Sequence, residues 1–113
     1  MIGVFDSGAG GVSAVLELSA LLPRENIIFL ADRKNAPYGT KTETELLRLM
    51  RQNIRRLAEM GAERILIACC TASALWQRLP KWERSITLPI ITLTAESISE
   101  ETKRVAVIAT EYT

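Results

Sequence analysis

Short, continuous apolar runs separated by helical patterns constrain the fold of this chain more than any other feature of its sequence. Continuous rather than alternating apolar residues are typical of parallel strands that are buried on both faces. Strands that alternate with helices pair in parallel through right-handed crossovers. We therefore predict an α/β fold with a doubly wound, mostly parallel open sheet of the flavodoxin-like, three-layer kind. The expected strands lie at 2–5, 26–30, 64–68, 88–93 and 104–109.

The helices expected between these strands are marked by apolar spacing and by end signals. The clearest helix begins at Thr42, which forms a T-x-x-E capping box with Glu45, and it ends near Gly61, where a helix stop belongs. The first helix is expected to stop before Pro23. Helices are predicted at 10–22, 42–61, 71–79 and 94–102, and connections at 31–41 and 80–87.

Composition bounds the class of protein. The 113 residues carry 14 Lys and Arg against 13 Asp and Glu, a net charge of +1 that gives no broad attraction to nucleic acid or to an anionic membrane. No apolar run approaches the roughly 20 residues that a membrane-spanning helix needs. The N-terminus reads as a strand rather than as a signal peptide. We therefore expect a cytoplasmic protein without nucleic-acid or membrane partners.

Histidine, the commonest metal ligand and general base, is absent from the sequence. The two cysteines, Cys69 and Cys70, are adjacent, so they cannot cross-link distant segments and do not provide two ligand pairs for zinc. We expect no metal and no cofactor. The plainest interpretation of both cysteines is a pair of buried, reduced thiols.

Polar residues gather where the predicted strands end. In open α/β sheets, ligands bind outside the carboxyl ends of the strands. A cysteine that leaves a buried strand at the start of a helix has its thiolate favoured by the helix dipole. The residues that follow these strand ends are Asp6, Ser7 and Gly8, then 32–39, then Cys69, Cys70 and Thr71, and finally Thr110.

The glycine-rich turn from Asp6 to Gly11 leaves alternatives open. Its backbone N–H groups at a helix start favour an anion. A dinucleotide fingerprint would need glycine or alanine where Ser13 stands, and Asp32 would then be the ribose-binding acid. A plain tight turn is the remaining interpretation.

Four segments, in this order, resemble glutamate racemase of the aspartate/glutamate racemase family: I-G-V-F-D-S-G-A-G-G, A-P-Y-G-T-K, A-C-C-T-A-S and V-I-A-T-E-Y-T. The resemblance runs from Ile2 to Thr113 and concerns the N-terminal half of such an enzyme. It implies a cofactor-independent isomerase that interconverts L- and D-glutamate. One cysteine thiolate removes the Cα proton and a second cysteine returns a proton to the opposite face. The family role is to supply D-glutamate for peptidoglycan in bacterial cell-wall biogenesis.

The resemblance also implies roles for individual residues. Cys69 is one of the two catalytic cysteines, and Asp6 helps to set its protonation state. Cys70 stands where the family has asparagine, and a thiol cannot make the paired donor and acceptor contacts of an amide. The segment 32–36 also differs from the Asp-Thr-Ala-Arg pattern of the family. The expected substrate-binding residues are Ser7, Pro37, Tyr38, Gly39, Cys70, Thr71, Thr110 and Thr113.

The second catalytic cysteine of the family lies in a C-T-H segment that this sequence lacks. Cys70 cannot replace it, because consecutive Cα atoms are only about 3.8 Å apart and cannot flank one substrate. We expect residues 1–113 to be a single, truncated racemase-type domain, with 1–93 as the first domain and 94–113 as the start of the second half. Alone it would be impaired, unless a homodimer placed two copies of Cys69 across one glutamate or aspartate. The alternative is a non-catalytic amino-acid-binding or assembly domain.

Two further features fit more than one interpretation. Arg48, Arg51, Arg55 and Arg56 share one predicted helix and suggest either a nucleic-acid patch or, given the balanced total charge, a solvated face. Trp76 and Trp82 suggest either internal packing or a dimer contact.

Overall fold

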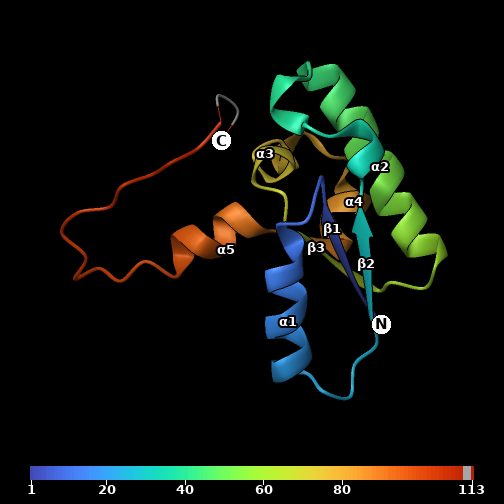
Figure 1. The fold of residues 1–113 in the computed structure, drawn as a ribbon, viewed down its shortest axis with the longest axis horizontal. Coiled ribbons are helices and arrows are strands. Elements are labelled where there is room, and N and C mark those ends of the chain that lie inside the picture. Colours follow the sequence, from blue (N-terminus) through green and yellow to red (C-terminus); the bar gives the residue numbers. More distant parts are fainter. Residues whose placement is uncertain (111–112) are drawn as a thin grey trace.

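A computed structural model describes residues 1–110 and 113. Its centre is a four-stranded parallel sheet with the strand order β2-β1-β3-β4 (Figure 1). This confirms the predicted α/β fold and its open parallel sheet. The strands are β1 (Ile2–Asp6), β2 (Ile27–Ala31), β3 (Arg64–Ile67) and β4 (Thr87–Pro89).

The strand order places a topological switch point between β1 and β3. The chain moves from β1 to β2 on one side, and then crosses back over β1 to β3 on the other side. Val4 pairs with Phe29 of β2 and with Leu66 of β3, so β1 is held on both edges. Connections that leave in opposite directions open a crevice at the carboxyl ends of these two strands.

One face of the sheet carries the main core. Its longest helix is α2 (Glu43–Glu59), which begins at Thr42, whose side chain accepts a hydrogen bond from Glu45 N, and which is followed by Gly61 at φ +97°. This confirms the predicted helix start at Thr42 and the helix stop. Of the predicted capping box, the structure shows the bond to Thr42, while the Glu45 side chain accepts from Lys41 Nζ. The face is completed by α3 (Cys70–Ser73), η3 (Trp76–Arg78) and α4 (Lys81–Ile86). Fully buried side chains of this core are Phe5, Leu46, Met50, Ile54, Leu57, Ile65 and Ile67.

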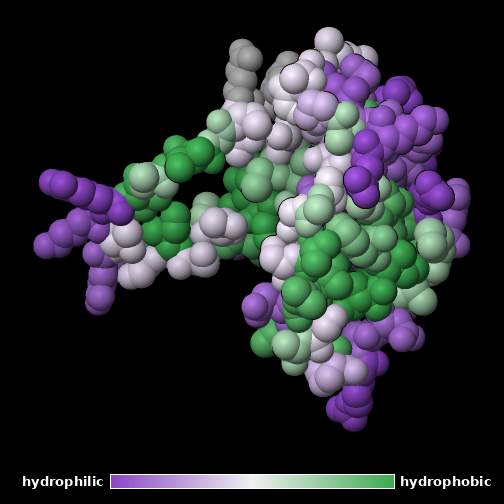
Figure 2. All heavy atoms as spheres, viewed as in Figure 1, coloured by the Kyte–Doolittle hydropathy of each residue, from purple (hydrophilic) through white to green (hydrophobic). Residues whose placement is uncertain are grey.

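The opposite face is covered by α1 (Gly11–Leu21) and α5 (Ile90–Glu96). Side chains alternate between the faces of a strand, so Leu66 and Ala68 point toward this side, and both line a cavity with α1 and Ile90. Only Gly11 of α1 is buried. Figure 2 shows a broad apolar area over α1 and the neighbouring strand.

Several predicted element boundaries are wrong. The segment 80–87 was predicted to be a connection but contains α4, and the helix expected over 71–79 is divided into α3 and η3. The strand expected at 88–93 is limited to Thr87–Pro89, after which α5 begins. The connection at 31–41 contains the short helices η1 (Arg33–Asn35) and η2 (Tyr38–Thr40).

The predicted fifth strand at 104–109 is not formed. This apolar segment leaves the sheet, and Val105, Val107 and Ile108 are exposed by 54%, 77% and 102%. A strand needs a neighbour to satisfy its backbone hydrogen bonds, and 104–109 pairs with none of the described strands. Across the described residues, no helix is both long and apolar enough to cross a membrane.

Candidate active site

The turn after β1 fixes a carboxylate at the switch point. Asp6 is buried, and its Oδ2 accepts a hydrogen bond of 2.9 Å from the backbone N–H of Gly11 at the start of α1. A Cβ atom on Gly11 would lie 2.8 Å from Phe29 Cε2 and 2.9 Å from Asp6 Cβ, so only glycine fits there. The sequence therefore needs a glycine at this position to bring α1 onto the carboxylate and the sheet.

The same contacts argue against the dinucleotide alternative. The Asp6 carboxylate already occupies the N–H group at the start of α1 that a pyrophosphate would use. Asp32, the expected ribose-binding acid, accepts hydrogen bonds from Tyr38, Asn35 and Asn53 instead. Both halves of a dinucleotide site are thus committed to internal contacts.

Cys69 lies at the end of β3, directly across the switch point from the turn after β1. Its side chain is 5% exposed, and Sγ donates a hydrogen bond of 3.4 Å to Ser7 Oγ. Two residues 62 positions apart are thereby joined. The structure thus brings together three of the predicted site residues, with Asp6 next to Ser7 in the chain.

Cys70 differs from Cys69 in position and in environment. It is exposed, on the first turn of α3. Partial burial of its sulfur, followed by the electrostatic influence of the nearby Cys69 and Asp6, raises the pKa of the Cys70 thiol. Cys70 is therefore held in its protonated form at neutral pH, which makes it a poor candidate for a base. The α3 helix has only four residues, so the helix dipole expected to act on Cys69 is that of a single turn.

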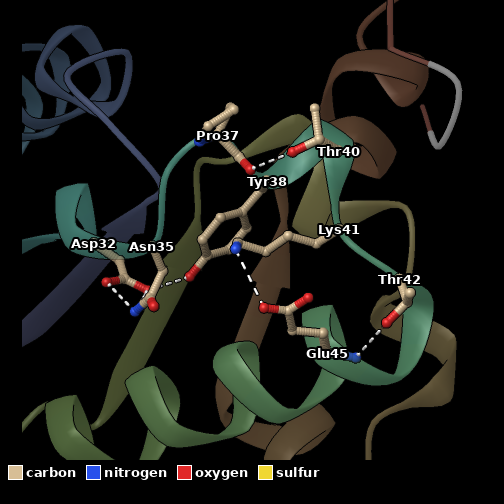
Figure 3. A network of polar contacts seen from close by, with 8 residues as sticks. All are labelled: Asp32, Asn35, Pro37, Tyr38, Thr40, Lys41, Thr42 and Glu45. Carbon is tan, nitrogen blue, oxygen red and sulfur yellow. Dashed lines mark hydrogen bonds and ion pairs between the residues drawn. The ribbon is translucent and has the colours of Figure 1, made fainter.

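The predicted Pro37-Tyr38-Gly39 segment is fixed by a polar network (Figure 3). The Ala36–Pro37 peptide bond is cis, and the Tyr38 ring is buried against Phe5 with ring centroids 6.1 Å apart. Tyr38 Oη donates a hydrogen bond of 2.5 Å to Asp32 Oδ2. Burial, and then the hydrogen bond and charge of Asp32, raise the pKa of Tyr38, which stays neutral. Its side chain is therefore structural, and only the backbone of this segment is left for a ligand.

Asn53 completes this network and was not predicted. Its Nδ2 donates to Asp32 Oδ2 at 3.1 Å and to Tyr38 Oη at 3.0 Å. Asn35 Nδ2 donates to the two Asp32 oxygens at 2.8 and 3.1 Å. The signal that would have found Asn53 is its place on the apolar stripe of α2, where a buried amide needs a hydrogen-bonding partner.

The C-terminal segment returns to the same edge of the sheet. Thr71 is buried, and its Oγ1 lies 3.2 Å from Thr110 Oγ1, which in turn lies 3.0 Å from Thr113 Oγ1. A Cβ on Gly39 would lie 3.2 Å from Thr110 Cγ2. Figure 1 shows the end of the chain beside α3. Thr110 therefore reaches the site although the strand predicted before it is absent.

Two of the four arginines on α2 contact one buried acid. Glu83 of α4 is fully buried and accepts hydrogen bonds from Arg51 Nε at 3.0 and 3.2 Å. Arg55 Nε lies 3.4 Å from the same carboxylate, and its guanidinium lies over the Trp82 ring at 5.8 Å. Two of the four arginines thus stabilise the α2–α4 contact rather than form a purely solvated face. Trp76 is an internal packing residue, with Nε1 donating to Thr87 Oγ1 at 2.9 Å.

The described residues hold no group of three or more His, Cys, Asp or Glu side chains that could bind a metal ion.

Comparison with known proteins identifies relatives of this chain. No model of a protein family matches the chain. Glutamate racemase from Trichodesmium erythraeum is 40% identical over an alignment of 115 positions that covers 99% of this chain. Glutamate racemase from Gloeobacter violaceus is 33% identical over an alignment of 114 positions that covers all of this chain. This chain is a homologue of glutamate racemase. It spans 42% and 43% of the length of these two relatives, about two fifths of each protein.

Solved structures agree with this relationship. Glutamate racemase from Aquifex pyrophilus superposes with a TM-score of 0.82 at 28% identity, over 90% of this chain and 41% of that one. Glutamate racemase from Francisella tularensis, solved in complex with D-glutamate, gives a TM-score of 0.69 at 37% identity, over 76% of this chain and 33% of that one. The parallel sheet of this chain is therefore similar to part of the fold of these glutamate racemases.

Proposed function

We propose that this chain is the cysteine-bearing first part of an amino-acid racemase that interconverts L- and D-glutamate. The observation that carries the proposal is the contact between Cys69 Sγ and Ser7 Oγ across the switch point of the sheet. A buried thiol at this edge, hydrogen-bonded to the residue that follows a fixed carboxylate, offers a base for proton transfer at a carbon acid. The homology to glutamate racemases supports glutamate as the substrate.

In the proposed reaction Cys69 acts as a thiolate and removes the proton from Cα of the amino acid. The electron pair stays on the substrate as a carbanion, and a second acid on the opposite face donates a proton to Cα. The Asp6 carboxylate influences the protonation state of Cys69 from the neighbouring turn. Ser7, Thr71 and the backbone at 37–39 hold the amino and carboxylate groups, with Cys70, Thr110 and Thr113 at the margin.

The second acid has to come from outside the surface formed by Cys69 and Ser7. Cys70 cannot supply it, because it adjoins Cys69 in the chain and the two thiols cannot flank one Cα atom. We propose that residues 1–93 form a first domain and that 94–113 lead toward a second one that carries this acid. The role of the complete enzyme would be to supply D-glutamate for peptidoglycan synthesis in the cytoplasm.

The experiment is deuterium exchange at Cα of L- and D-glutamate and of both aspartates in D₂O, followed by NMR. Cys69→Ala is expected to reduce any exchange by about 10²- to 10⁴-fold. Cys70→Ala, which removes the neighbouring thiol at the margin of the site, is expected to reduce it much less. Exchange with inversion would require a second thiol from a homodimer. Exchange of one enantiomer with retention would indicate one working base.

A second candidate function, a non-catalytic amino-acid-binding or assembly domain, is favoured by one observation. Val12, Leu16 and Leu21 of α1 are exposed by 43%, 66% and 74%, which is typical of an interface rather than of a free surface. Absence of exchange, together with glutamate-dependent NMR shifts near Ser7 and Cys69, would support this candidate. Absence of both exchange and binding for all four amino acids would refute the racemase proposal for this chain.

A further inference from the structure

A second concave site lies along the outer edge of β2, apart from the Cys69 thiol. The cavity has a volume of about 670 Å³, within the range of small-molecule sites. One wall is β2 from residue 28 to residue 31. The facing wall is the side of α2 from Arg48 to Arg56, together with Met60 just after the helix, and the end is lined by 32–35. Since β2 is the last strand on this side of the sheet, the cavity is not filled by a further strand.

The charges around this cavity are strongly unbalanced. Arg33 and Lys34 lie at its end, and Arg48 and Arg56 lie along its α2 wall, two helical turns apart. All four side chains are exposed, and none of them makes an ion pair within residues 1–110 and 113. Their neighbours Arg51 and Arg55, by contrast, both pair with the carboxylate of Glu83.

One carboxylate lines the cavity, and it is already in use. Both oxygens of Asp32 accept hydrogen bonds, from Asn35, Tyr38 and Asn53. Asp32 is therefore turned toward the internal network and leaves the four cations without an acidic partner in the lining. Guanidinium groups in such a position suit the paired oxygens of phosphate or carboxylate groups.

The lining also has an apolar part, beside the polar side chains Asn35 and Gln52. Leu30, Leu49 and Met60 contribute to the walls, so the cavity offers an apolar surface beside the cations. In Figure 2 the apolar area over β2 borders the hydrophilic band along α2. A ligand that matches both parts carries a phosphate or similar anionic group on a flat or apolar body.

We propose that this cavity binds a small phosphorylated organic anion, with Arg48 and Arg56 as its principal contacts. The site is separate from the thiol and does not rest on the racemase proposal. A second copy of this chain is a poorer occupant, because pairing two β2 edges would bring the two sets of cations together. The concave shape and its volume fit a small molecule better than a flat macromolecular surface.

The test uses ADP as the probe, in calorimetric titrations of the whole chain at low ionic strength. ADP is expected to bind saturably to one site, more tightly than adenosine, which lacks the phosphates, and than pyrophosphate, which lacks the apolar body. Arg48→Gln and Arg56→Gln are each expected to weaken ADP binding about tenfold, and added salt is expected to weaken it further. Arg24→Gln, a change to an exposed arginine outside the cavity, is the matched control and is expected to leave binding unchanged.

Glutamine has a helix propensity close to that of arginine, so far-UV circular dichroism should show that both cavity variants keep α2. NMR shifts on adding ADP are expected at Leu30, Gln52 and Met60. The proposal is overturned if ADP does not bind saturably, if Arg48→Gln and Arg56→Gln bind as the parent chain does, or if the shifts appear only near Ser7 and Cys69. It is equally overturned if a glutamate-rich peptide occupies the groove and ADP does not, since the groove would then be a protein interface.

Discussion

The two faces of the sheet are covered by helices of very different burial. On the α2 face, six residues of one helix are buried, and they meet Phe5, Ile65 and Ile67 from the strands. On the α1 face, only Gly11 is buried, although α1 carries at least as continuous a set of apolar residues. The comparison teaches that apolar spacing predicts a helix but does not say how many of its sides are covered. A helix that is apolar on most of its surface is suited to be covered on both its inner and its outer side.

The largest expected difference between the faces is in core substitutions. Leu57→Ala, at a fully buried position on α2, should cost about 2–5 kcal/mol of unfolding free energy, because it removes contacts and leaves a cavity. Leu16→Ala, at a position 66% exposed on α1, should change it by no more than about 0.5 kcal/mol. Urea unfolding measures both. Equal costs for the two variants would mean that the α1 face is closed in solution.

A somewhat smaller loss is expected at the α2–α4 contact. Arg51→Gln combined with Arg55→Gln leaves the Glu83 carboxylate buried without its cations. This variant should lose about 3 kcal/mol, because a buried charge then lacks compensation. The companion Glu83→Gln removes the charge itself and should lose less, since both arginines are partly exposed and can be hydrated. Thermal or urea unfolding that ranks the two variants in the reverse order would contradict this account of the contact.

The Asp32 network predicts a smaller, pH-dependent effect. Partial burial would raise the pKa of Asp32, but the hydrogen bonds from Tyr38, Asn53 and Asn35 outweigh it and lower the pKa below the ordinary value of 3.8. The folded state therefore holds the proton less tightly than the unfolded state. The stabilisation is present above pH 3.8 and is lost as the pH falls through the folded value.

Asp32→Asn should cost about 1–2 kcal/mol at neutral pH, because the carboxylate accepts several of these bonds. The gap between the variant and the parent should narrow as the pH falls below about 4. Urea midpoints measured across pH 3 to 7 provide the test. Asn35→Ala is the control, since it removes a single donor and should show a weaker version of the same trend. A gap that is constant with pH would exclude the carboxylate as the source.

The smallest effect on folding is expected on the α1 face, where substitutions should instead change the exposed apolar surface. Leu16→Lys with Leu21→Lys places charges at two exposed positions and should leave the unfolding free energy within about 0.5 kcal/mol. The same pair should reduce binding of a hydrophobic dye and any concentration-dependent association seen in sedimentation. Unchanged dye binding would mean that the apolar surface recognised by the dye lies elsewhere, for example on Val107 and Ile108.

Local signals account for the elements that the sequence predicted correctly. The capping pair Thr42 and Glu45, and Gly61 after the helix, predicted α2, and the continuous runs predicted β1, β2 and β3. The strand predicted at 88–93 was wrong beyond Pro89, because a short apolar stretch fits a strand or a helix equally well. The structure places this stretch partly in β4 and partly in α5. The strand predicted at 104–109 was wrong, because a strand forms only where a neighbouring strand is present to pair with it. The local sequence does not show whether such a neighbour exists.

The site shows the same division between local and distant information. Asp6, Ser7 and Cys69 were expected at one edge because each follows a strand, and the structure joins Ser7 to Cys69. The roles of these residues in proton transfer stay a prediction. The network of Asp32 and Asn53 was missed because its members lie 21 positions apart and form no motif. Spacing within one helix is visible in a sequence, whereas a contact between a loop and a helix depends on the finished packing.

The hydrogen bond between Asp6 Oδ2 and Gly11 N has a consequence for genetic dissection of the site. One oxygen of this side chain is structural, because it accepts the hydrogen bond that holds the start of α1. The other oxygen is the one available to a substrate or a thiol. An amide keeps the hydrogen bond to Gly11 N but replaces the second acceptor oxygen with a donor. Asn at position 6 would still accept the Gly11 proton through its carbonyl oxygen, but it would present a donor where the carboxylate presents an acceptor. The two contributions of this residue are thus separable by a single isosteric change.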